Sequence, residues 1–211
     1  MSGEFSKPVR MNHARLDASM SDDPAEMVMD PAERAAIAHD TAHLLLERGT
    51  SAEDGEVLTR LVQFADENGL DTLAELWSYS PPATLPGALW RLYLVRAVLR
   101  HNLEDARALF QRGVDDLPTI DPIVAGAPDP LSVDDLARLL DDIVAGVFQG
   151  DLAHALERAG SVARAVSAGA LAFAWSGADD DSYFSSRSLN WSVIAEELRH
   201  AAQLARSGML T

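Results

Sequence analysis

The strongest constraint on the fold comes from residues 85–118, the longest strongly apolar part of the chain, which contains its own break. Apolar side chains occupy nearly the whole circumference of its first half, and a helix of this kind is usually covered on more than one side. Thr84 is predicted to cap the first helix, and Asn102 to cap the second. We therefore expect two helices, joined at His101-Asn102, that form a central hairpin of the fold.

The rest of the chain shows the same helical spacing, and no stretch alternates convincingly as a strand. Capping residues and glycines predict helices over residues 30–49, 51–69, 70–79, 132–150, 151–175 and 189–207. The prediction is a single all-α domain at residues 30–207, built from about eight helices as stacked antiparallel hairpins or an irregular bundle. Loops are expected at 118–130 and, with acidic character, at 176–188, and a flexible N-terminal arm at 1–29.

Composition excludes several classes of function. The chain has no cysteine, which removes disulfides, thiolate metal sites and cysteine nucleophiles and favours a reducing, cytoplasmic setting. Its formal net charge of −16 argues against nucleic-acid binding, because affinity for phosphates comes largely from Lys and Arg. No apolar run approaches the roughly 18 residues of a membrane span, so no membrane contact is expected.

Three predicted helix junctions share a turn residue followed by a leucine. These leucines, Leu70, Leu103 and Leu152, are 33 and 49 residues apart. A spacing near 33 in paired helices, with Trp90, Ala106, Phe110 and Pro118 in order, resembles the tetratricopeptide repeat. This resemblance covers residues 85–118 only and implies a superhelix of helical hairpins that binds protein segments.

Two residues depart from that repeat pattern. Leu94 stands where the family has a small residue, and Gly113 stands near the end of the second helix, where it is expected to mark the helix end. Generic antiparallel hairpins need only a turn, a cap and spaced apolar residues, so they explain the junctions as well. Ala106 and Phe110 are packing residues under either interpretation. The chain also resembles all-helical proteins of high-GC bacteria, a resemblance that implies no activity.

A metal site is the most specific chemical hypothesis. His39 and His43 are four residues apart on a predicted helix and can offer both rings to one ion, with Glu47 one turn further as a third ligand. Glu197 and His200 repeat the Glu-x-x-His spacing of di-iron bundles, although no second copy occurs. The alternatives are a solvated helix face or a subunit contact.

The arginines of the first central helix suggest a binding strip. Arg91, Arg96 and Arg100 lie on a helix otherwise suited to burial, so they either pair with carboxylates of the same chain or grip an acidic segment of a partner. The four tryptophans, Trp77, Trp90, Trp175 and Trp191, stand in apolar helical contexts typical of core residues, although an exposed pair would suit an interface.

These patterns favour a non-catalytic protein-interaction or regulatory helical module that binds a protein partner or a second copy of itself. The chain has no Gly-rich phosphate loop, no Gly-x-Ser-x-Gly elbow and no dinucleotide fingerprint, and no cofactor is expected. The alternative function is a metal- or small-ligand-binding helical bundle, enzymatic or not, that uses His39, His43 and Glu47 or Glu197 and His200.

Overall fold

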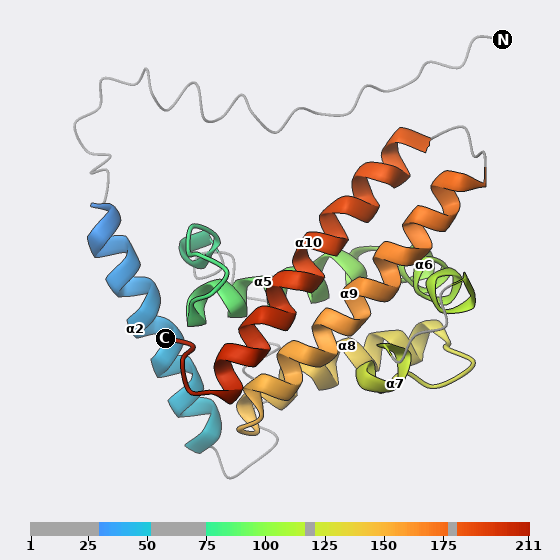
Figure 1. Cartoon of the computed structure of the whole chain (residues 1–211). Helices are drawn as coiled ribbons and strands as arrows, with labels where there is room; N and C mark the ends of the chain where they lie inside the picture. Colours follow the sequence, from blue (N-terminus) through green and yellow to red (C-terminus); the bar gives the residue numbers. More distant parts are fainter. Residues whose placement is uncertain (1–29, 52–74, 117–120, 177–180) are drawn as a thin grey trace, which may run out of the picture.

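The computed structural model describes residues 30–51, 75–116, 121–176 and 181–211, and all regular structure in these ranges is helical, as predicted (Figure 1). The helices are α2 (Pro31–Ser51), α5 (Leu85–His101), α6 (Leu103–Asp116), α7 (Asp121–Ala125), α8 (Val133–Phe148), α9 (Leu152–Trp175) and α10 (Asp181–Arg206). A short helical turn at residues 75–78 precedes α5. Three predicted features lie outside the described residues: the N-terminal arm, Pro118 and nearly all of the helix over 51–69. Of that helix only Ser51 is described, and it is the last residue of α2.

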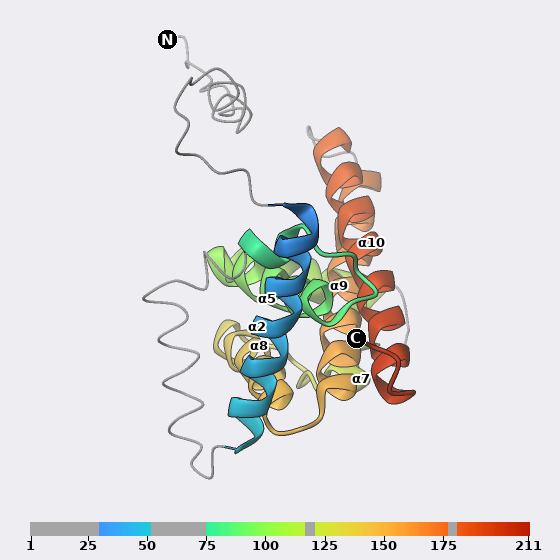
Figure 2. The same cartoon turned by 90° about the vertical axis from the view of Figure 1, so that its left-hand side faces the viewer.

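Most of the other described helices pack on α9. It lies antiparallel to α10 along most of its length and also packs against α5, α6, α7 and α8 (Figure 1). The pair α9 and α10 forms one side of the molecule, with α5 and α8 beside it and α2 packed on those two (Figure 2). The prediction that residues 85–118 form the central hairpin is therefore wrong for the described residues, because α6 packs chiefly on α9 and touches α5 little.

Two glycines explain how α6 and α9 come so close together. A Cβ atom on Gly113 would lie 1.9 Å from the carbonyl oxygen of Ala165, and one on Gly169 would lie 1.8 Å from that of Leu109. The backbones of the two helices are thus in direct contact. The sequence predicted that Gly113 would mark the end of its helix, but this prediction is wrong, because α6 continues to Asp116. Its missing side chain serves tertiary packing instead.

The helix starts that capping residues predicted are confirmed. Thr84 Oγ1 accepts from the N–H of Gly87 at 3.3 Å, and Asp151 Oδ1 accepts from that of His154 at 3.1 Å. Ser132 and Asp135 form a reciprocal capping box at the start of α8. Helix starts are local events, which is why the sequence reveals them.

Other boundaries differ from the prediction. Helix α2 runs to Ser51 and passes the predicted stop at Gly49. The predicted loop at 118–130 contains the short helix α7, and α10 begins at Asp181, so residues 181–188 are helical and not part of an acidic loop. None of the described helices is both long and apolar enough to cross a membrane.

The capping box of α8 leads to a testable prediction about the pKa of Asp135. The Ser132 hydroxyl, 2.5 Å from Asp135 Oδ2, and the Ser132 backbone N–H lower the pKa of Asp135 below its ordinary value, with help from Arg138. Ionised Asp135 therefore stabilises the fold above its unfolded-state pKa, and this contribution is lost as pH falls through the lower folded-state pKa. Replacing Ser132 with alanine is expected to raise the Asp135 pKa, measured by carboxyl ¹³C NMR titration.

A matched control for this titration is Ser192→Ala. The hydroxyl of Ser192 donates to the backbone oxygen of Leu189 and touches no carboxylate of the capping box. An Asp135 titration midpoint that stays in place in Ser132→Ala, or that moves equally in both variants, would contradict the assignment.

Candidate functional site

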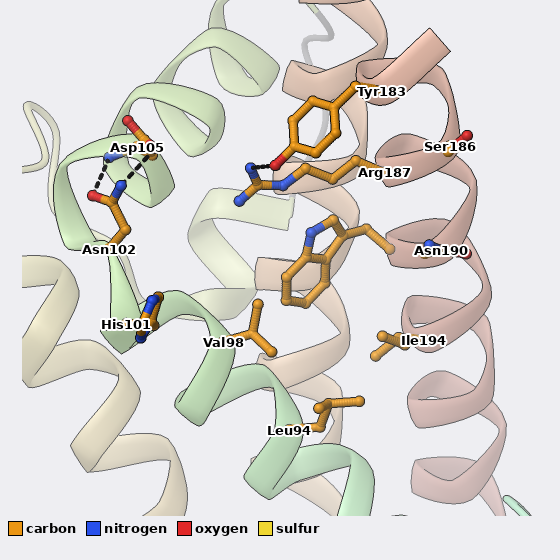
Figure 3. Close-up of a pocket in the computed structure, with 11 residues that line it drawn as sticks. Leu94, Val98, His101, Asn102, Asp105, Tyr183, Ser186, Arg187, Asn190 and Ile194 are labelled. Atoms are coloured by element: carbon orange, nitrogen blue, oxygen red, sulfur yellow. Dashed lines mark hydrogen bonds between the residues drawn. The ribbon is translucent and has the colours of Figure 1, made fainter. Parts of the chain in front are cut away.

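An open groove with a volume of about 590 Å³ lies between α5, the start of α6, and α10 (Figure 3). We call it the α5–α10 groove. Its apolar lining comes from Leu94 and Val98 of α5 and from Trp191 and Ile194 of α10. Trp191 is only 4% exposed, whereas Val98 is 42% exposed, so the indole belongs to the floor and the valine is accessible from solvent.

The groove arises because two helix faces have no covering element among the described residues. Leu94, Val98 and His101 recur with helical spacing on α5, as do Arg187, Trp191 and Ile194 on α10. Both helices pack against α9, but they contact each other far less than α10 contacts α9. Val98 thus remains exposed, and Leu94 and Ile194 are only half-buried.

One end of the groove is polar. Arg187 Nη1 donates a hydrogen bond of 3.0 Å to the Tyr183 hydroxyl, and its guanidinium lies 5.9 Å from the centre of the Tyr183 ring. Figure 3 shows Arg187 extending from α10 towards the opposite wall, where Asn102 Nδ2 donates to Asp105 Oδ2 at 2.6 Å. No ion pair involves Arg187 in the part of the chain that the structure describes.

The predicted metal ligands on α2 are not gathered into a site. His39 is half-buried, with Nδ1 2.8 Å from the backbone oxygen of Ala35, and the side chains of His43 and Glu47 are exposed. Glu197 accepts from Arg91 Nε at 2.5 Å, while His200 is exposed. No group of three or more His, Asp or Glu side chains suited to a metal occurs within residues 30–51, 75–116, 121–176 and 181–211. Metal binding remains a prediction from spacing alone.

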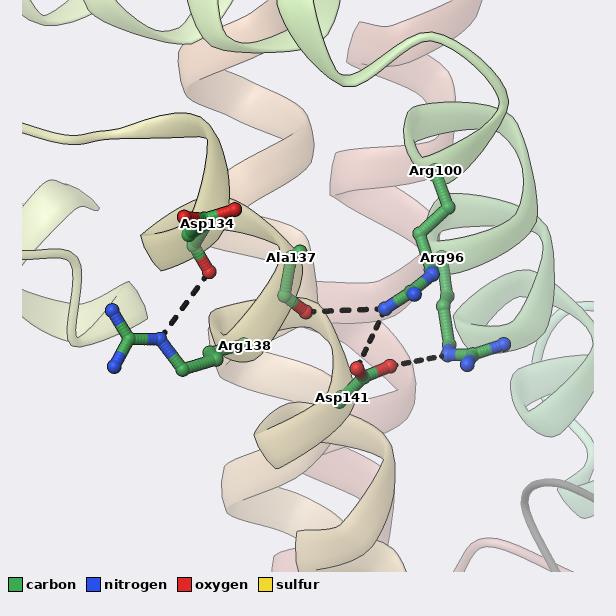
Figure 4. Close-up of polar contacts among 6 residues, drawn as sticks. All are labelled: Arg96, Arg100, Asp134, Ala137, Arg138 and Asp141. Atoms are coloured by element: carbon green, nitrogen blue, oxygen red, sulfur yellow. Dashed lines mark hydrogen bonds and ion pairs between the residues drawn. The ribbon is translucent and has the colours of Figure 1, made fainter.

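The three arginines of α5 pair with carboxylates of the same chain, which is one of the two expected arrangements. Arg91 pairs with Glu197 of α10. Arg96 Nε lies 2.9 Å from Asp141 Oδ1, and Arg100 Nη1 lies 2.6 Å from Asp141 Oδ2 (Figure 4). The Arg96 side chain is only 8% exposed. These pairs tie α5 to α10 and α8, so a role in gripping a partner stays a prediction.

The tryptophans divide between core and surface. Trp77 and Trp191 are buried, and Trp77 Nε1 donates to Thr41 Oγ1 at 3.1 Å. Trp90 is half-buried near Tyr93, and Trp175 at the end of α9 is 83% exposed. The helical spacing of Trp191 and Ile194 predicts that they share the apolar face of the last helix. Their role as groove residues was missed, because no local pattern shows which apolar face is left uncovered.

Comparison with known proteins supplies no further constraint. No protein-family model matches the chain, and neither a curated protein nor a solved structure does. The geometry and charge of the α5–α10 groove are therefore the features that bear on function.

Proposed function

We propose that the protein is a non-catalytic interaction module, and that the α5–α10 groove receives an apolar segment of another protein. The groove itself carries this proposal, because it leaves Val98 exposed and Leu94 and Ile194 half-buried around the buried Trp191. Apolar side chains that lose contact with water at the centre of an interface are typical of the few positions that dominate its binding energy.

The chemistry of the groove supports binding over catalysis. Two pairs of its polar side chains are hydrogen-bonded to each other, Arg187 to Tyr183 and Asn102 to Asp105, and neither pair has the arrangement of a nucleophile with its base. The chain has no cysteine and none of the common phosphate or nucleophile motifs. A groove with an apolar floor and a polar end suits recognition of a segment that is itself amphipathic.

The charge of the chain supports a partner with a basic surface. A net charge of −16 creates a long-range field that speeds the approach of cationic partners and is screened by salt. The absence of cysteine suits a reducing compartment, and we propose the cytoplasm as the setting.

Val98→Glu is expected to weaken binding of an apolar segment by about tenfold or more, because the carboxylate would be buried beneath the bound segment. The probe is a displayed library of 18-residue amphipathic helical peptides, selected on the intact chain. Binding of the selected peptides is then measured by fluorescence anisotropy. Val98 is partly exposed, so the variant is expected to fold, as circular dichroism can check.

Val193→Glu is the matched control. Val193 is 48% exposed, close to the 42% of Val98, and adjoins Ile194 on α10, but it does not line the groove. The same peptides should bind this variant as they bind wild type. A library that yields no binder, or binders equally affected by both substitutions, would remove the groove as the recognition surface.

A further inference from the structure

We infer that the partner segment is an amphipathic α-helix that carries an acidic residue against Arg187, an inference that rests on the proposed function. The α5–α10 groove has an apolar floor along its length and a cation at one end. A helix with apolar side chains on one face and a carboxylate one or two turns away matches both features.

The walls of the groove favour a helix over an extended strand. Both walls are helices, whose backbone N–H and C=O groups are bonded within the helix, so they offer no edge to which a strand can add. The α10 residues that line the groove run from Tyr183 to Ile194, which corresponds to about 16 Å, or three helical turns. Helices that dock in such grooves use anchors at positions i, i+3 or i+4, and i+7.

Arg187 supplies the charge complementarity. Most of the described arginines pair with a carboxylate of the chain, including the three on α5, but Arg187 is held only by the hydroxyl and ring of Tyr183. Its guanidinium is thereby placed at the groove with donors still open to a ligand. A carboxylate on the bound helix would accept paired hydrogen bonds from it, the geometry in which arginine is most selective.

The polar end of the groove also restricts where the acidic residue of the partner can lie. Asp105, on the opposite wall, already accepts from Asn102, and a second carboxylate placed against it would be repelled. The acidic residue of the partner is therefore directed to the α10 side of the groove, while its remaining polar face can be basic, in keeping with the charge of the chain.

The test uses the tightest helical peptide from the library selection in three forms, with Glu, Gln or Lys at the position nearest the polar end. Because a helix can dock in either direction, each residue is placed in turn at both ends of the peptide. Binding to the full chain is measured by fluorescence anisotropy. In one of the two directions, wild type should prefer Glu over Gln by about fivefold.

Arg187→Glu should abolish the preference for Glu and favour Lys instead. Arg199→Glu is the control, because it makes the same charge change on the same helix, at a residue that pairs with Glu196 and does not line the groove. This control should keep the preference for Glu, which separates a local contact from the overall charge.

The outcomes separate the two proposals. Peptides that depend on Val98 but show no charge preference would overturn the inference and leave the proposed function standing. Absence of any groove-dependent peptide would overturn both. Two further results would reassign the occupant and overturn the inference. One is Arg187-dependent binding of dodecanoate without helix binding, and the other is a dimer of the chain that Val98→Glu dissociates, seen by light scattering.

Discussion

Replacing Gly169 with alanine is expected to lower the free energy of unfolding by about 3 kcal/mol, the upper part of the range for overpacked cores. The added Cβ atom would lie 1.8 Å from the carbonyl oxygen of Leu109. That oxygen belongs to the backbone of α6, so it cannot move aside as a flexible side chain would. The two helices would have to separate, and urea denaturation followed by circular dichroism would measure the loss.

Gly146→Ala provides the matched control for this substitution. Gly146 lies inside α8, and its nearest atom to an added Cβ is the Cβ of Ala155 at 3.8 Å, an ordinary contact. Alanine favours a helix interior by about 0.5–1 kcal/mol relative to glycine, so this variant should be slightly more stable than wild type. If Gly169→Ala also proved neutral or stabilising, the direct backbone contact between α6 and α9 would be refuted.

The close contact of α6 and α9 shows where prediction from sequence ends. The helix starts at Thr84, Ser132 and Asp151 follow from side chains within three residues of the backbone groups they cap. Gly113 also resembled a local signal, a helix stop. Its actual role depends on Ala165 and Gly169, whose positions in space follow from the whole fold and not from neighbouring residues.

The candidate site was less predictable than the fold for the same reason. The apolar face of α10 was visible in the spacing of Trp191 and Ile194, but the groove also requires Leu94 and Val98 and the lack of a described element between the two faces. Histidine spacing on α2, in contrast, is a local pattern that suggests a metal pair. A metal site also requires a third ligand whose side chain lies close to both histidines in the folded structure. The described residues contain no group of three such ligands.

Arg187 illustrates a different limit. Its charge is evident from the sequence, but most described arginines are paired, and only the structure shows that its neighbour is Tyr183 and no carboxylate. The chain has 33 acidic residues against 17 basic ones, so carboxylates are abundant, but composition does not show which arginines pair with them. Arg187 is one of several described arginines outside these ion pairs, and it is informative because it lies at the end of an apolar groove.

Phe110→Ala is expected to cost about 3–5 kcal/mol of unfolding free energy, the range for removing a buried aromatic side chain. Phe110 is 2% exposed and belongs to the main hydrophobic core. It lies on α6, whose backbone contacts that of α9 at Gly113 and Gly169. Trp175→Ala is the control, since Trp175 is 83% exposed and its loss should change stability by no more than about 0.5 kcal/mol. Equal effects of the two substitutions in urea denaturation would contradict the described core.

The double variant Gly169→Ala with Phe110→Ala tests whether one contact underlies both effects. Leu109, whose backbone oxygen meets Gly169, adjoins Phe110 on α6, so separation of α6 from α9 should already loosen the packing around the phenyl ring. The combined loss should then fall short of the sum of the single losses by more than about 0.5 kcal/mol, as expected for coupled neighbours. Strict additivity would mean that Phe110 is held by parts of the core that do not depend on the α6–α9 contact.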